Sequence, residues 1–340
     1  MRRAFLRPLL AAAAAIAAFS SAQAQTVLTV SSWVPASVPL SIAQKQWCDM
    51  LKTRTAGKMR CNILPRAVAN PPGTYDAIKS GVADVSFAVP GYTPGRFALP
   101  QVAEFPFLGD SAESTSVAFS RIAGKYPQFA EELRDVHVLA FFTDAPGMLM
   151  NTKRSVTKLS ELQGLKWRVS GGVINDVAAA LGMNATLKPA TDTYELLSSG
   201  VMDGTLFPAD AVEPWKIDKL VKYATVVPGG FYNTSFVFIM NKARYEKLSA
   251  DEKQAVDALS GETAARLFGK AWDVADQRGM GLMQNNGVQM TKADAAFIQD
   301  IRTRVEPVER QWVEKAKAKG LSDPAKVLQE LRAEVNKAGQ

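Results

Sequence analysis

Apolar and polar positions follow two alternating patterns along the chain. Short apolar runs predict strands at 27–31, 60–64, 85–88, 165–169 and 185–188. Helical spacing predicts helices between these strands at 40–55, 71–79 and 173–181. Strands that alternate with helices favour βαβ units and a largely parallel sheet. We therefore expect an α/β fold.

The last third of the chain adds a returning strand and several helices. The apolar run at 236–240 predicts a strand that rejoins the sheet of the first half. A capping box at Ser249 and Glu252 predicts the start of a long helix that extends beyond Trp272. Further helices are predicted to begin near 291–294 and near Pro324. No linker rich in Gly, Ser or Pro interrupts the chain, so we expect several crossings that together form a hinge.

One pattern, Y-x4-S-G-V-x-D, occurs twice, beginning at Tyr75 and at Tyr194. In each copy an amphipathic helix ends at a glycine, a residue favoured just after a helix, and an apolar segment follows. A generic helix–glycine–strand unit would also recur by coincidence. We interpret the repeat as two similar lobes, in which Asp84 and Asp203 share a structural role. The predicted ranges are 25–146 plus 234–272 for lobe I and 147–233 plus 273–340 for lobe II.

The first 24 residues have the features of a secretory signal peptide. Three arginines precede an apolar run at 9–19, and an A-x-A cleavage site occupies 22–24. The run is shorter than the roughly 20 residues that a membrane-spanning helix needs, although a membrane anchor is the alternative. We expect cleavage after Ala24, export to the periplasm, and a mature chain that does not insert into the membrane.

Charge and composition exclude several classes of function. The formal net charge is +7, with three of the positive charges in the signal peptide. The remaining charges are interspersed, which indicates a solvated surface and argues against nucleic-acid binding. The single histidine, His137, argues against histidine-based catalysis, and nucleotide-binding and nucleophile-elbow motifs do not occur. We expect no catalytic residues, no metal and no cofactor, and therefore no enzyme.

Two cysteines, Cys48 and Cys61, lie on a predicted helix and a predicted strand. Oxidising compartments permit a disulfide between them, but sequence alone does not establish the required geometry. Both the bonded and the free state agree with the sequence.

Four motifs occur in order along the chain: S-G-V-A-D at 80–84, A-E-F-P-F at 103–107, E-L-Q-G-L-K-W-R-V at 161–169 and S-G-V-M-D-G at 199–204. Together they resemble the substrate-binding subunits of tripartite ATP-independent periplasmic (TRAP) transporters, the dicarboxylate-binding-protein-like family. The similarity extends from about Val27 past Trp272. It implies a two-lobe, type II-like periplasmic binding protein with a hinge and a long helix spanning both lobes. It also implies that a small organic acid is delivered to membrane permease subunits driven by an ion gradient.

The resemblance implies that Arg168 binds the ligand's carboxylate. The chemistry agrees, because a guanidinium can bind a carboxylate through two parallel charge-assisted hydrogen bonds. Alternation along the strand places Arg168 on the face opposite Trp167 and Val169. It lies near the carboxyl end of the strand, where α/β sheets place their ligands.

Several positions depart from relatives that bind polar sugar acids. Where those relatives carry Asn, Glu, Arg and Asn, this chain has Trp33, Val89, Met148 and Phe207. Tyr92, Tyr232 and Asn233 are further candidate ligand contacts, although ordinary core packing also explains each aromatic residue taken singly. We predict an aromatic or branched aliphatic monocarboxylate, with Tyr232 or Asn233 available to a 2-oxo or 2-hydroxy group.

Three other functions fit parts of the sequence: a type II binding protein of an ATP-driven importer, a secreted enzyme on the same lobes, and a ligand sensor. The ordered motifs oppose the first, and the lack of a catalytic constellation opposes the second.

Overall fold

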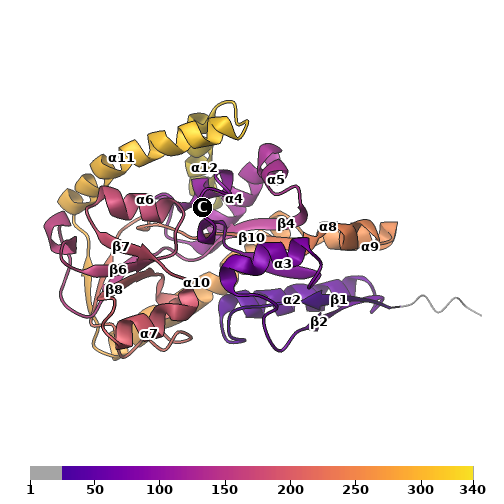
Figure 1. Ribbon diagram of the computed structural model, residues 1–340, viewed down its shortest axis with the longest axis horizontal. Helices are drawn as coiled ribbons and strands as arrows, with labels where there is room; N and C mark the ends of the chain where they lie inside the picture. The colour runs from indigo at the N-terminus through magenta and orange to yellow at the C-terminus, as the bar shows by residue number, and fades with distance from the viewer. Residues whose placement is uncertain (1–24, 340) are drawn as a thin grey trace, which may run out of the picture.

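The structure, a computed structural model, describes residues 25–339, and the predicted signal peptide lies outside the described residues. Two mixed sheets form its centre (Figure 1). The first has the order β2-β1-β3-β10-β4, with β1 Thr26–Val30, β2 Met59–Ile63, β3 Val85–Ala88, β4 Val136–Thr143 and β10 Ser235–Asn241. The second has the order β11-β9-β5-β8-β6-β7, with β5 Met148–Asn151, β6 Lys166–Val169, β7 Asn184–Leu187, β8 Gly204–Phe207, β9 Tyr223–Val226 and β11 Gln289–Lys292.

Each sheet has a parallel part and an antiparallel part. β1 runs parallel to β2 and β3, and β6 runs parallel to β7 and β8. β10 runs antiparallel to both β3 and β4, and β5 runs antiparallel to both β8 and β9. The predicted α/β fold is confirmed, and the returning strand at 236–240 corresponds to β10.

Helices cover both sheets. The α-helices are α2 Pro39–Arg54, α3 Thr74–Lys79, α4 Ala112–Lys125, α5 Gln128–Glu132, α6 Val173–Ala180, α7 Thr193–Ser198, α8 Lys242–Glu246, α9 Ala250–Ala258, α10 Glu262–Asn285, α11 Ala295–Ala318 and α12 Pro324–Ala338. Short 3-10 helices are η1 Pro71–Gly73, η2 Pro90–Tyr92, η3 Leu99–Glu104, η4 Leu159–Leu162, η5 Ala190–Asp192 and η6 Ala209–Ala211.

The prediction of a single long helix from Ser249 is wrong, because the chain forms two helices there. The capping box at Ser249 is present, but α9 ends at Ala258. Gly261 then takes a φ of 59°, outside the helical region, and its N–H donates to the Leu139 carbonyl at 2.6 Å. α10 starts after this break. It packs against α2 and α4 beside the first sheet and against η6, which follows a strand of the second.

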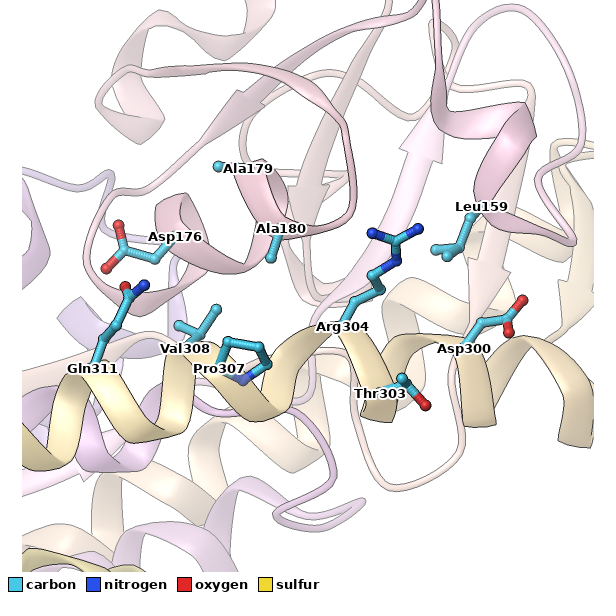
Figure 2. A pocket seen from close by; sticks show the side chains of 10 residues that line it. All are labelled: Leu159, Asp176, Ala179, Ala180, Asp300, Thr303, Arg304, Pro307, Val308 and Gln311. Carbon is cyan, nitrogen blue, oxygen red and sulfur yellow. The ribbon is translucent and has the colours of Figure 1, made fainter.

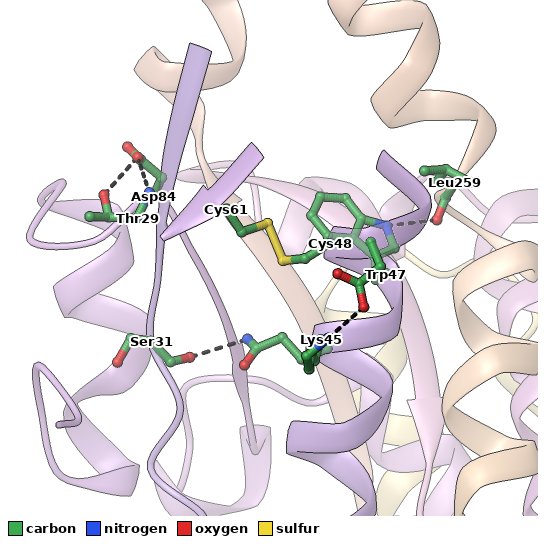
Figure 3. The surroundings of a disulfide bond; sticks show 10 residues. Thr29, Ser31, Lys45, Trp47, Cys48, Cys61, Asp84 and Leu259 are labelled. Atoms are coloured by element: carbon green, nitrogen blue, oxygen red, sulfur yellow. Dashed lines mark hydrogen bonds and ion pairs between the residues drawn. A yellow bond between two sulfur atoms is a disulfide. The ribbon is translucent and has the colours of Figure 1, made fainter. Parts of the chain in front are cut away.

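The repeated pattern has the same structural role in both halves. The Asp84 carboxylate accepts hydrogen bonds from the backbone N–H and the hydroxyl of Thr29, both at 2.7 Å (Figure 3). The Asp203 carboxylate accepts one from the backbone N–H of Lys166 at 2.9 Å. Each aspartate therefore joins the start of one strand to a parallel neighbour, which supports a structural role.

Cys48 and Cys61 form a disulfide between α2 and β2, with their Cα atoms 5.7 Å apart (Figure 3). The neighbouring Trp47 is fully buried, and its indole N–H donates to the Leu259 carbonyl at 3.0 Å. The question that the sequence left open is thus settled in favour of the bonded state, which holds the first strand pair against α2.

The C-terminal helices connect the two halves. All strands of the first sheet fall within the ranges predicted for lobe I, and all strands of the second fall within those for lobe II. α11 contacts α6, whereas α12 packs against α4 beside the first sheet (Figure 1). Trp312 of α11 also donates from its indole N–H to the Ala98 carbonyl at 2.9 Å. The exact lobe boundaries stay a prediction.

Candidate functional site

A small cavity of about 50 Å³ lies between the two halves, and both contribute to its walls. Its lining includes Trp33, Tyr92, Asp144, Arg168, Ser170, Phe207, Asp210, Trp215 and Trp272. Several of these residues lie at or just beyond the carboxyl ends of strands: Trp33 after β1, Tyr92 after β3, Asp144 after β4, Arg168 in β6 and Phe207 at the end of β8. Open α/β sheets place their ligands at this edge.

Arg168 is completely buried in this cavity. Its Nε donates to the Lys188 carbonyl at 2.8 Å, and Nη1 lies 3.4 Å from the Leu206 carbonyl. The guanidinium carbon lies 4.5 Å from the centre of the Phe207 ring. Within residues 25–339 no acidic side chain forms an ion pair with it. A buried cation is costly unless it is paired, so the arrangement favours the binding of an anion.

Tyr92 connects the two halves at the same point. It lies in η2, after a strand of the first sheet, and its hydroxyl accepts a hydrogen bond from the Ala190 N–H at 3.1 Å. The same hydroxyl lies 3.5 Å from Nη2 of Arg168. Burial raises the pKa of Tyr92, so the hydroxyl stays protonated at neutral pH. The structure therefore holds a neutral hydroxyl next to the guanidinium.

Aromatic rings form much of the remaining wall. The Trp33 ring packs edge-on against Tyr92, with centroids 6.2 Å apart, and its indole N–H donates to the Phe87 carbonyl at 3.3 Å. Because this N–H is already used, Trp33 presents mainly apolar surface to the cavity. Together with Phe207, Trp33 and Tyr92 surround the Arg168 end of the cavity with rings.

Four predicted contacts are buried nearby but are not among the residues that line the cavity: Val89, Met148, Tyr232 and Asn233. Met148 pairs with Phe207 across β5 and β8. The Tyr232 ring occupies the space beside Gly147, so closely that a β-carbon there would overlap it. The Asn233 amide donates to the Asp144 carbonyl at 3.0 Å. The structure thus gathers Trp33, Tyr92 and Phe207 around Arg168, while the other four are buried and lie outside the cavity lining.

Two acidic residues of the cavity wall were not identified from the sequence. Asp144 accepts a hydrogen bond from the Thr234 N–H at 2.6 Å, and burial raises its pKa to about 8. Asp210 lies in η6, and burial raises its pKa well above the usual range. Each residue follows shortly after a strand with an apolar sequence, and this position is the feature of the sequence that could have marked it as a candidate. Only the fold shows that they lie in one cavity.

Backbone from the two halves approaches closely beside the cavity. A β-carbon at Gly91 would lie 3.0 Å from the carbonyl carbon of Gly171, and one at Gly172 would overlap the Glu104 carboxylate. That carboxylate accepts hydrogen bonds from the Val173 N–H at 2.8 Å and the Ser235 hydroxyl at 2.5 Å. Burial raises the pKa of Glu104 to about 7. These contacts join η2 and η3 to the start of α6.

A wider hollow lies elsewhere, between α6 and α11 (Figure 2). Its lining mixes Asp176, Asp300 and Arg304 with small and apolar residues, and Asp176 is ion-paired with Lys315 at 3.0 Å. It is open to solvent, and Asp300 and Arg304 on its wall are exposed. The buried guanidinium makes the cavity around Arg168 the better candidate site.

Comparison with known proteins agrees with this geometry. The family model for bacterial extracellular solute-binding protein, family 7 (DctP), matches residues 30–316. The chain belongs to this family. The resemblance to TRAP solute-binding subunits is thereby confirmed, and with it the two-lobe architecture. Within residues 25–339, no helix of this family 7 protein is long and apolar enough to span a membrane.

Three solved relatives of the family 7 protein are especially similar. A TRAP periplasmic solute-binding protein from Bordetella bronchiseptica, with bound (R)- and (S)-mandelate, is 37% identical, with a TM-score of 0.89 over 92% of this chain and 99% of the other. A marine metagenome TRAP protein specific for aromatic acids, in complex with 3-hydroxybenzoate, is 30% identical, with a TM-score of 0.86 over 93% and 99%. A TRAP protein from Rhodoferax ferrireducens with copurified benzoate is 26% identical, with a TM-score of 0.85 over 92% and 98%.

Proposed function

We propose that this family 7 protein is exported to the periplasm, captures an aromatic monocarboxylate there, and delivers it to the membrane permease of a TRAP transporter. The observation that carries the proposal is the buried Arg168 guanidinium, which has no acidic partner among the described residues and is surrounded by aromatic rings. Three similar proteins bind mandelate, 3-hydroxybenzoate and benzoate, each an aromatic acid with one carboxylate.

In this proposal Arg168 binds the carboxylate, while Trp33, Tyr92 and Phe207 contact the ring. Burial of apolar surface is favourable by about 25 cal/mol per Å². The hydroxyls of a sugar acid, left unpaired against the same rings, would cost about 1–3 kcal/mol each. The cavity thus favours an aromatic or branched apolar body over a polar one. Val89, Met148, Tyr232 and Asn233 are buried and lie outside the cavity lining.

We also propose that ligand binding favours the closed arrangement of the two lobes. Tyr92 reaches from the first half to Ala190 and Arg168 of the second, beside the bound carboxylate in this proposal. A ligand that contacts both halves binds the closed state more tightly and shifts the population towards it. The lobes we propose are 25–146 plus 234–272 and 147–233 plus 273–340, with α12 packed on the first of them.

The test is isothermal titration calorimetry of the mature protein with benzoate, 3-hydroxybenzoate and mandelate, and with glucuronate and succinate as comparison ligands. We expect at least one aromatic acid to bind at micromolar or lower Kd and both comparison ligands to bind at least 100-fold more weakly. Small-angle scattering with the tightest ligand should show a smaller radius of gyration. Tight binding of glucuronate or succinate, without binding of any aromatic acid, would refute the proposal. Catalytic turnover of a tightly bound acid would favour the enzyme alternative.

A further inference from the structure

Asp210 is a buried acidic group in the cavity that carboxylate binding by Arg168 does not use. It follows Phe207 and Pro208 and lies in η6, and only 8% of the residue is exposed. The Asp276 carboxylate of α10 accepts hydrogen bonds from the N–H groups of Ala209 and Asp210, at 2.7 and 3.2 Å. The backbone under Asp210 is therefore held in place, and its side chain contributes to the cavity wall.

One oxygen of Asp210 lacks a hydrogen-bond partner. Oδ1 is inaccessible to solvent and accepts no hydrogen bond from any residue in the described part of the chain. The other cavity acid, Asp144, differs, because its Oδ1 accepts the Thr234 N–H at 2.6 Å. Buried polar atoms in native proteins nearly always have a partner, and leaving one without a partner is costly. Asp210 is among the residues that line the cavity that holds Arg168.

The missing partner is best supplied by a hydroxyl group. An oxygen of a carboxyl group accepts hydrogen bonds whether or not the group is ionised, if it does not carry the proton. Among residues 25–339 no group of three or more His, Cys, Asp or Glu side chains could hold a metal ion. An apolar ring placed against Oδ1 would leave it unpaired, whereas an O–H would satisfy it.

We propose that Asp210 is a specificity-determining residue that accepts a hydrogen bond from a hydroxyl group of the bound acid. The cavity would then prefer hydroxylated aromatic monocarboxylates over their unsubstituted counterparts. This inference rests on the proposed function and names its substrate class. In this inference Asp210 takes the place of Tyr232 and Asn233 as the partner of the second oxygen, since neither of those residues is among the ones that line the cavity.

The experiment compares matched ligand pairs by calorimetry: 3-hydroxybenzoate with benzoate, and mandelate with phenylacetate. For wild type we expect the hydroxylated member of at least one pair to bind about tenfold tighter or more, as one hydrogen bond to an otherwise unpaired buried acceptor implies. Asp210→Ala should bring that ratio close to one while the unsubstituted acid keeps its affinity within about threefold. Asp210→Asn, which keeps an acceptor oxygen, should retain much of the preference. The exposed Glu213→Ala, three residues further on, is the matched control and should retain the wild-type ratio.

The outcomes separate this inference from the function on which it rests. Wild-type protein that binds both members of each pair equally overturns the role of Asp210 and leaves aromatic-acid binding intact. If Asp210→Ala still prefers the hydroxylated acid, another group accepts the hydrogen bond from the ligand's hydroxyl, and the proposed role of Asp210 is also overturned. If no aromatic acid binds wild type, the proposed function itself has failed. Should Asp210→Ala not fold, Asp210→Leu removes the same oxygens with a larger apolar side chain, and the same loss of preference is expected.

Discussion

Replacement of Arg168 by alanine is the most direct test of the site. The guanidinium is completely buried and has five N–H donors. Only the bond from Nε to Lys188 is short, at 2.8 Å, while the contacts of Nη1 and Nη2 with protein atoms are 3.4 and 3.5 Å. The terminal nitrogens are thus available for a carboxylate. In Arg168→Ala the ligand's carboxylate would be desolvated without a cation to pair with it.

The size of the effect follows from that loss. Removing one partner of a buried, hydrogen-bonded charge pair costs about 2–5 kcal/mol. The dissociation constant should therefore rise by about 30-fold to several thousand-fold. Arg168→Lys should recover little of this, because an ammonium group lacks the planar fork and its shorter reach leaves the Phe207 ring without its stacked partner.

Calorimetry with the tightest aromatic acid measures this effect, and thermal melting of each ligand-free variant checks that it is folded. Arg134→Ala is the matched control, because Arg134 is a largely exposed arginine paired with Glu131. Its ligand affinity should equal that of wild type. If Arg168→Ala, correctly folded, bound the acid within threefold of wild type, Arg168 would not be the carboxylate-binding residue.

Three further predictions concern stability and closure. Burial raises the pKa of Glu104 from 4.5 to about 7, so the native state binds more protons than the unfolded chain between these two pH values. The free energy of unfolding should therefore fall as the pH rises from 4.5 to about 7. Glu104→Gln should remove that contribution, so Tm should change less between pH 5 and pH 8 than in wild type; an unchanged pH dependence would contradict this. Gly172→Ala should weaken ligand binding at least tenfold by calorimetry, since its β-carbon overlaps Glu104 and blocks the contact between the halves. Gly182→Ala is its control, having a similar positive φ with nothing within 4 Å, and should lower Tm without changing affinity. Reduction of the Cys48–Cys61 disulfide should lower the free energy of unfolding by about 3 kcal/mol, given the short loop that it closes, and leave ligand affinity within twofold, as denaturation and calorimetry can show.

The sequence alone determined the local features of this protein. Strand and helix positions follow from hydrophobic periodicity, and most predicted strands agree with the structure to within a residue or two at each end. The repeated motif predicted the matching roles of Asp84 and Asp203, because a helix, a glycine and a strand lie within one short segment. Alternation in β6 placed Arg168 opposite Trp167, and the ordered motifs identified the family.

Contacts between distant segments were decided only by the tertiary structure. The long helix predicted from Ser249 breaks at Gly261 because that residue bonds to Leu139, which local propensity does not include. Tyr92 and Arg168 are far apart in the chain and meet only because the two halves pack against each other. Asp210 had no distinctive sequence pattern, since an unpaired buried oxygen is defined by what surrounds it in space. Periodicity reports which face of an element is buried, but the partner on that face depends on how the two sheets and α10 pack together.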